Sequence, residues 1–256
     1  MPNSADALME RINCLDRSNS ANCLDRSDRV NCLDRSERFN YLDRPVELPS
    51  EVHCCLTLVV DVSGSMESRI DDVSDAINKM FSDMRLVPRL AKIVDVSIIT
   101  FSDRDRHQLL LPFESVSSAK PVKLKTGMFT YAVKALEMAM ENISRQKARY
   151  GSGCYKPWIV FVTDGRIQED LREVSKRLKQ GEIDGKHHVL CFGAGENYNP
   201  AQLLQLSDRV FKIADCNFAE FFSWIGQSMA ALSASAPGDD IPVPLPEALI
   251  PLIDKN

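Results

Sequence analysis

Short apolar runs alternate with segments of helical period between residues 51 and 235. The runs are rich in valine and isoleucine, which favours strands buried on both faces. The predicted strands cover residues 56–60, 93–101, 108–113, 158–162, 188–192 and 210–213. The predicted helices cover residues 70–86, 133–143, 171–178, 203–206 and 218–232. This alternation predicts an α/β fold, because a helix that joins two parallel strands crosses one face of their sheet.

The second and third predicted strands are separated only by a polar turn at residues 102–106. So short a connection allows only an antiparallel hairpin. The fold class expected is therefore a doubly wound, mostly parallel sheet with one antiparallel edge strand and helices on both faces. Residues 51–235 form this domain, between an arm at residues 1–50 and a proline-rich tail at residues 236–256.

The arm contains a nine-residue repeat. The motif Asn-Cys-Leu-Asp-Arg-Ser occupies residues 13–18, 22–27 and 31–36, and a diverged copy occupies residues 40–45. Nine residues are about two and a half α-helical turns, so successive leucines would face opposite sides of a helix. With one leucine in each copy, the arm cannot build a packed core and is predicted to be disordered.

Three interpretations of the arm remain open. The repeat is either a replication-slippage product without a role, an array of equivalent docking motifs, or a set of enzyme sites. Arg-Ser pairs such as Arg17-Ser18 suit an Arg-directed protease, and the serines suit a kinase. Metal binding by Cys14, Cys23 and Cys32 is disfavoured, because their spacing without histidine is a poor zinc signal.

Composition excludes several classes of partner. The net charge is −5 and the chain has no basic block, so neither nucleic acid nor an anionic membrane is expected as a partner. No apolar run approaches the ~20 residues that a membrane span needs. The amino terminus lacks the basic and apolar regions of a secretory signal. The eight cysteines are therefore expected to be reduced thiols of a cytoplasmic protein.

Polar oxygens follow two of the predicted central strands. Asp61, Ser63 and Ser65 come at alternate positions after the strand at residues 56–60. Thr163-Asp164-Gly165 ends the strand at residues 158–162. At the switch point of a doubly wound sheet the carboxyl ends of neighbouring strands meet, so Asp61 and Asp164 should lie side by side. Such oxygens suit Mg²⁺ better than zinc.

With a threonine before the helix at residues 133–143, these residues resemble the metal-ion-dependent adhesion site of von Willebrand factor type A domains. The resemblance covers about residues 53–235. It implies that the two serines bind Mg²⁺ directly and that the aspartates and the threonine bind it directly or through water. The implied ligands are Asp61, Ser63, Ser65, Thr130 and Asp164, and Mn²⁺ and Ca²⁺ are alternative cations.

Thr130 competes with Thr126 for the threonine position. The family usually has Gly-Gly-Thr in this loop, whereas Met128 and Phe129 precede Thr130 here. Thr130 is preferred because the helical pattern then begins where the helix of the family begins. Met128 and Phe129 either pack in the core or shape the contact with a partner.

The site is expected to bind rather than to catalyse. Two carboxylates roughly neutralise Mg²⁺, and neutral hydroxyls leave it able to accept an Asp or Glu carboxylate from a partner protein. A haloacid-dehalogenase-like phosphatase is the enzymatic alternative, but it needs an acid two residues beyond Asp61, where Ser63 stands. No catalytic residues and no organic cofactor are therefore expected.

Within the family, residues 156–165 and 237–239 resemble the TerY proteins of bacterial tellurium-resistance and stress operons. This resemblance implies a cytosolic scaffold encoded beside a kinase and a phosphatase. The expected function is metal-dependent binding of a protein partner in a stress or defence system. The alternative is that the repeat arm is the substrate of a protease or kinase that the folded domain recruits.

Overall fold

The computed structural model describes residues 51–235 and 244–252. The nine-residue repeats, the predicted disorder of the arm and the first part of the proline-rich tail lie outside these residues.

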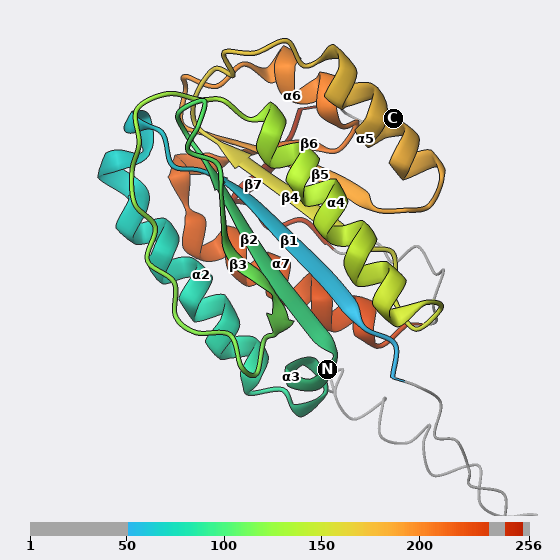
Figure 1. Ribbon diagram of the computed structural model, residues 1–256. Helices are drawn as coiled ribbons and strands as arrows, with labels where there is room; N and C mark the ends of the chain where they lie inside the picture. Colours follow the sequence, from blue (N-terminus) through green and yellow to red (C-terminus); the bar gives the residue numbers. More distant parts are fainter. Residues whose placement is uncertain (1–50, 236–243, 253–256) are drawn as a thin grey trace, which may run out of the picture. The chain divides into compact units, whose positions relative to one another are not determined.

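A seven-stranded sheet forms the centre of the domain (Figure 1). Its strand order is β3-β2-β1-β4-β5-β6-β7, and β2, β1, β4, β5 and β6 are parallel to their neighbours in this series. The strands are β1 (Cys54–Asp61), β2 (Val94–Phe101), β3 (Gln108–Ser115), β4 (Trp158–Thr163), β5 (His188–Ala194), β6 (Val210–Ile213) and β7 (Leu249–Pro251). This arrangement confirms the predicted fold class.

Helices cover both faces of the sheet, so the side chains of each buried strand enter two cores. In β1, Leu58 belongs to the core cluster that α2 and α7 cover, whereas its neighbour Val59 belongs to the cluster under α4, α5 and α6. Figure 1 shows α4 crossing one face of the sheet and α7 on the other. The helices are η1 (Gly64–Arg69), α2 (Ile70–Arg85), α3 (Pro88–Ile93), α4 (Val133–Tyr150), α5 (Arg172–Ile183), α6 (Pro200–Leu206), η2 (Ala214–Cys216) and α7 (Phe218–Ser233).

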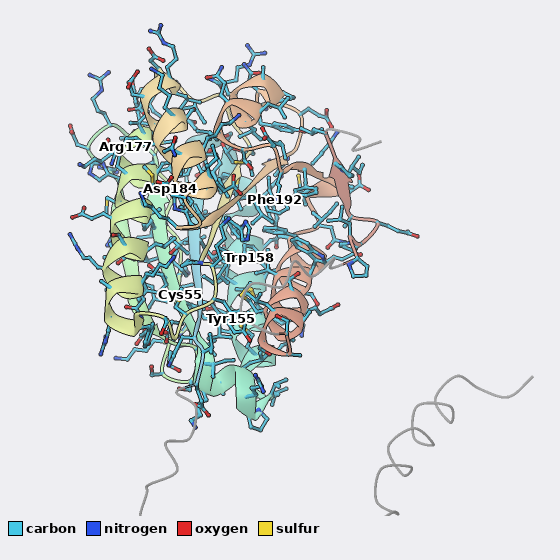
Figure 2. The ribbon with its side chains drawn as sticks, turned by 90° about the vertical axis from the view of Figure 1, so that its right-hand side faces the viewer. Cys55, Tyr155, Trp158, Arg177, Asp184 and Phe192 are labelled. Carbon is cyan, nitrogen blue, oxygen red and sulfur yellow. The ribbon has the colours of Figure 1, made fainter. Side chains whose placement is uncertain are left out.

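Aromatic packing fixes α7 against the sheet. Phe192 of β5, labelled in Figure 2, lies 4.5 Å from Phe221 and 6.1 Å from Trp224, measured between ring centroids. Aromatic pairs at such separations stabilise a core beyond the area that they bury. The helical spacing of aromatic residues in the sequence therefore corresponds to one buried face of this helix.

The structure contains elements that the sequence did not predict, among them α3, η1 and β7. Residues 88–93 form the short helix α3, because Pro88 occupies its first turn, where a missing N–H is tolerated. A 3-10 helix, η1, directly follows the turn after β1. The tail contributes β7, a second antiparallel edge strand whose Leu249 pairs with Ile213 of β6.

The switch point lies between β1 and β4. The two strands are parallel, with Leu56 opposite Trp158 and Val60 opposite Val162. Their carboxyl ends therefore meet at the same edge of the sheet, where open α/β folds bind their ligands.

Candidate metal centre

The ends of β1 and β4 are joined through their side chains. Thr163 Oγ1 donates a hydrogen bond to Asp61 Oδ2 over 2.5 Å. The other carboxylate oxygen, Asp61 Oδ1, accepts from the backbone N–H of Ser63 at 2.8 Å. Asp61 is fully buried. Its carboxylate is therefore fixed in one orientation by one hydrogen bond from each strand end.

The turn after β1 places two hydroxyls beside the second carboxylate. Ser63 Oγ and Ser65 Oγ lie 3.1 Å apart. Ser65 Oγ donates to Asp164 Oδ1 over 2.5 Å. A chain of oxygens thus runs from the turn after β1 to Asp164 at the end of β4. The sequence predicted that Asp61 and Asp164 lie at the same edge of the sheet, and they do.

Gly165 marks the point on which these oxygens converge. A Cβ atom added to this glycine would lie 3.0 Å from Thr130 Oγ1, 3.6 Å from Ser65 Oγ and 3.8 Å from Asp61 Oδ2. Two segments of the chain, the turn at residues 61–65 and the loop of Thr130, therefore direct three oxygens at one small space beside this glycine. It is Thr130, preferred over Thr126 from the sequence, that supplies the threonine oxygen here.

Two further side chains complete the surroundings. The sequence shows Thr163 only as part of the Thr163-Asp164-Gly165 motif, whereas in the structure its hydroxyl binds Asp61. The guanidinium of Arg69, at the end of η1, donates to Asp164 Oδ2 over 3.3 Å. No sequence pattern indicated Arg69, because its position depends on the path of η1.

Burial dominates the electrostatics of the two carboxylates. It raises the pKa of Asp61 to about 6, opposed by the hydrogen bonds from Thr163 and Ser63 and supported by the nearby charge of Asp164. Burial also raises the pKa of Asp164, against the hydrogen bond from Ser65 and the charge of Arg69. Burial therefore disfavours the ionised form of both carboxyl groups.

The loop before α4 is held over the site by Asp103. Its Oδ1 accepts from the backbone N–H groups of Met128 at 3.3 Å and Phe129 at 3.2 Å. No pattern in the sequence indicates that Asp103 reaches this loop. Met128 and Phe129 are 74% and 47% exposed, so of the two alternatives left open by the sequence, packing in the core is wrong. They stand at the rim of the site instead.

The donor set fits a hard cation. Carboxylate and hydroxyl oxygens are the ligands of Mg²⁺ and similar ions, whereas zinc sites use cysteine and histidine. Within residues 51–235 and 244–252, no three His, Cys, Asp or Glu side chains are grouped to hold a metal. Most of the side chains that supply oxygens to this cluster are therefore serines and threonines.

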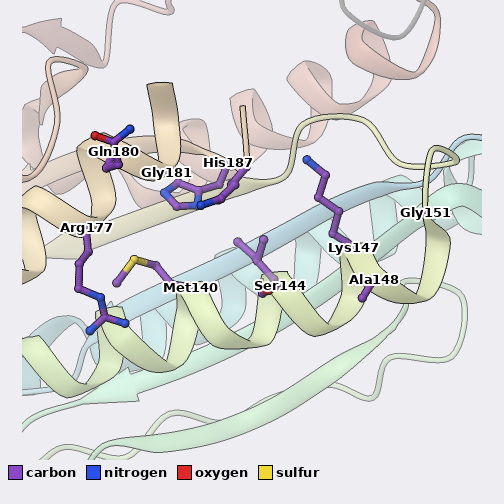
Figure 3. A pocket seen from close by; sticks show the side chains of 11 residues that line it. Met140, Ser144, Lys147, Ala148, Gly151, Arg177, Gln180, Gly181 and His187 are labelled. Carbon is purple, nitrogen blue, oxygen red and sulfur yellow. The ribbon is translucent and has the colours of Figure 1, made fainter. Parts of the chain in front are cut away.

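A separate cavity of about 600 Å³ lies between α4 and α5 (Figure 3). Met140, Ser144 and Lys147 line it from α4, and Gly181 and His187 line it from the other side. His187 immediately precedes β5, so the cavity is near the amino end of that strand and shares no residue with the oxygen cluster. In the described part of the chain, none of the helices has the length and apolar character to cross a membrane.

Several solved structures are similar to this chain. A search of curated proteins found no match. Among solved structures, the von Willebrand factor domain of the type V pili tip protein Mfa5 from Porphyromonas gingivalis is 10% identical, with a TM-score of 0.55 over 75% of this chain and 99% of that one. The pilus adhesin SpaC from Lactobacillus rhamnosus GG is 14% identical, with a TM-score of 0.54 over 72% of this chain and 30% of that one.

Proximal thread matrix protein 1 from the mussel byssus, in a structure with a zinc-occupied metal-ion-dependent adhesion site, is 17% identical with a TM-score of 0.47. That match covers 72% of this chain and 46% of the mussel protein, so this chain spans less than half the length of that protein. At 10% and 14% identity, the likenesses to Mfa5 and SpaC show the fold alone.

The sequence profile of the von Willebrand factor type A domain matches residues 56–223. That span begins in β1 and ends in α7, so it includes both strand ends that carry the oxygen cluster. Since the match covers more than half of the sequence, the chain belongs to the von Willebrand factor type A domain family.

Proposed function

We propose that this domain binds a partner protein through a Mg²⁺ ion held by Asp61, Ser63, Ser65, Thr130 and Asp164. The observation that carries the proposal is the convergence of Thr130, Ser65 and Asp61 oxygens on the space beside Gly165. Type A domains mediate protein–protein interactions, and a partner's Asp or Glu carboxylate would complete the coordination of the ion. Mn²⁺ and Ca²⁺ remain alternative occupants.

The charges of the site support a resident cation. Burial raises the pKa of both Asp61 and Asp164, so each carboxylate is destabilised as an anion in the metal-free protein. A divalent cation between them would reverse this effect, because an opposite charge within a few ångströms favours the ionised form. Arg69 meets only one oxygen of Asp164 and is itself partly exposed.

The same contacts favour binding over catalysis. Hydrogen bonds from Thr163 and from the backbone of Ser63 hold the Asp61 carboxylate in one orientation, and each oxygen keeps a lone pair for a cation. A phosphatase that used Asp61 as its nucleophile would need an acid two residues further on, where Ser63 stands. We therefore assign the aspartates as metal ligands and not as catalytic residues.

The rim indicates the kind of contact that surrounds the carboxylate. Met128 and Phe129 are exposed large apolar side chains at the site. Apolar and aromatic side chains at the centre of an interface exclude water from its polar contacts. We infer that the partner presents an acidic residue beside an apolar one.

For the biological setting, we propose a cytoplasmic scaffold or regulator similar to the TerY proteins. The segment of residues 156–165, which forms β4 and the Asp164 turn, carries that resemblance. The proposed partners are a kinase or a phosphatase of a stress or defence system. The five cysteines of the described residues are free thiols, which suits a reducing compartment.

The repeat arm supports a second candidate function. Its three Arg-Ser pairs at residues 17–18, 26–27 and 35–36 would offer a protease three cleavage sites, or a kinase three serines. In that case the folded domain recruits the enzyme, and the arm is its substrate.

A capture experiment in host lysate separates the two candidates. The full chain, its Asp61→Ala variant and a chain lacking residues 1–45 are immobilised with Mg²⁺ or with a chelator. Partner loss with Asp61→Ala and with the chelator supports the metal site. Loss only on removal of the arm, with capture insensitive to chelator, would reject the metal-bridged contact. Asp105→Ala, an exposed change in the β2–β3 turn, is the matched control.

A further inference from the structure

Two cysteines from distant parts of the sequence touch at the amino end of the sheet. The sulfur atoms of Cys55 and Cys154 lie 3.4 Å apart, although 99 positions separate them in the chain. Cys55 is in β1, and Cys154 lies four residues before β4. Figure 2 shows Cys55 next to Tyr155, the residue that follows Cys154. This contact joins the starts of the two strands whose other ends carry the oxygen cluster.

Backbone hydrogen bonds hold the two sulfur atoms in register. The N–H of His53 donates to Gly153 O at 2.8 Å, and the N–H of Tyr155 donates to His53 O at 2.9 Å. The phenol of Tyr155 is itself fixed by a hydrogen bond of 2.6 Å to Ser235 O. The contact between the sulfurs is therefore built into the pairing of two segments and does not depend on a mobile side chain.

The two thiols differ in access and acidity. Cys55 is buried, whereas Cys154 is partly exposed. The hydrogen bond between them lowers the pKa of Cys154 and raises the pKa of Cys55, and the charge of Lys147 also lowers that of Cys154, against burial. A partly exposed thiol of lowered pKa beside a buried thiol is the arrangement of an attacking and a resolving cysteine.

We propose that Cys154 and Cys55 are a redox modification site that a hydroperoxide converts to a disulfide. In the first step the Cys154 thiolate attacks one oxygen of hydrogen peroxide, so an S–O bond forms, the O–O bond breaks and hydroxide leaves as water after taking a proton. The Cys154 sulfur loses two electrons and the peroxide gains them. In the second step the Cys55 sulfur attacks the sulfenic acid, the S–O bond breaks, and the thiol proton of Cys55 leaves with the hydroxide as a second water.

Cys54 provides a matched control within the same strand. It is as deeply buried as Cys55, but successive strand residues point to opposite faces. Cys54 accordingly belongs to the core cluster on the α2 and α7 side. The proposal therefore requires that Cys55, and not Cys54, pairs with Cys154.

The test treats the reduced full chain with a small excess of hydrogen peroxide, blocks the remaining thiols and maps disulfides by mass spectrometry without reductant. Wild type and Cys54→Ser should yield a peptide pair that joins the segment of Cys55 to that of Cys154, and a dithiol should remove it. Cys55→Ser should instead accumulate a sulfenic acid on Cys154, which a cyclic 1,3-diketone traps.

Three results would overturn the proposal. Wild-type Cys154 could be recovered as a free thiol or as sulfinic acid without a linked peptide. The link could persist in Cys55→Ser and vanish in Cys54→Ser, which would make Cys54 the partner. Cys154 could also be linked to Cys14, Cys23 or Cys32 of the arm.

Discussion

The sheet buries one carboxylate near each end of its central strands, and the two carboxylates have different partners. At the amino end of the sheet, Asp95 accepts from His53 Nδ1 at 3.2 Å and from Gln146 Nε2 at 3.3 Å. At the carboxyl end, Asp61 accepts hydrogen bonds from Thr163 and from Ser63, and within the described residues no cationic side chain forms an ion pair with it. Both aspartates are almost completely buried.

This contrast indicates which end is complete by itself. The His53 ring stacks on Tyr150 with centroids 3.9 Å apart, so the partner of Asp95 is fixed by packing. The carboxyl end instead carries two acids of raised pKa, and the guanidinium of Arg69 pairs with one of them, Asp164. We infer that Asp95 and its partners at the amino end are structural, whereas the carboxyl end reaches its stable form only with an added cation.

Replacing each aspartate by asparagine gives the largest expected effects. Asp61→Asn should lower Mg²⁺ affinity about 100-fold, since it removes a ligand charge, and should not lower the melting temperature of the metal-free protein. Asp95→Asn should leave Mg²⁺ affinity unchanged and lower the free energy of unfolding by about 1–3 kcal/mol. Titration calorimetry and thermal unfolding measure both. Equal Mg²⁺ affinities of the two variants would remove the distinction between the ends.

Filling the space at Gly165 should have the next largest effect. The methyl group of Gly165→Ala would lie 3.0 Å from Thr130 Oγ1. It would therefore fill the space in which the cation is proposed to bind. We expect Mg²⁺ affinity to fall about 30-fold while the fold persists. Gly226→Ala is the control, because its Cβ would meet only Met80 and Met84 side chains at 3.6 and 3.7 Å. If calorimetry shows the same Mg²⁺ affinity for both variants, the ion binds elsewhere.

The effect of pH on Mg²⁺ binding should be smaller than the effects of Asp61→Asn and Gly165→Ala. Asp61 has a folded pKa of about 6, above its ordinary value near 4. Its protonated form therefore stabilises the metal-free fold fully below about pH 4, and this contribution is lost as pH rises through 6. Mg²⁺ must displace that proton, so its affinity should rise about tenfold between pH 5 and pH 7. A flat profile by calorimetry would contradict the buried-acid site, and Asp61→Asn should flatten the profile.

The sequence predicted the features that depend on periodicity and strand order. Apolar runs located the central strands, and the switch point placed Asp61 beside Asp164. Features that depend on the reach of one side chain to a distant segment left no such signal. Arg69 contacts Asp164 only because η1 turns toward β4, and Asp103 reaches the backbone of Met128 across two loops. Pro88 follows the helix predicted at residues 70–86, but it is also the first residue of the short helix α3, which the sequence did not predict.

Removing the charge of Arg69 should have the smallest effect and an opposite sign. The guanidinium donates to Asp164 Oδ2 and places a positive charge beside the proposed cation. Arg69→Gln should therefore tighten Mg²⁺ binding about threefold, a modest gain because the side chain of Arg69 is 35% exposed and water screens its charge. Arg149→Gln, an exposed change near the carboxyl end of α4, is the control. Weaker Mg²⁺ binding by Arg69→Gln would instead mean that Arg69 holds Asp164 in its ligating orientation. The carboxyl end would then already be ordered before the cation arrives, as the amino end is.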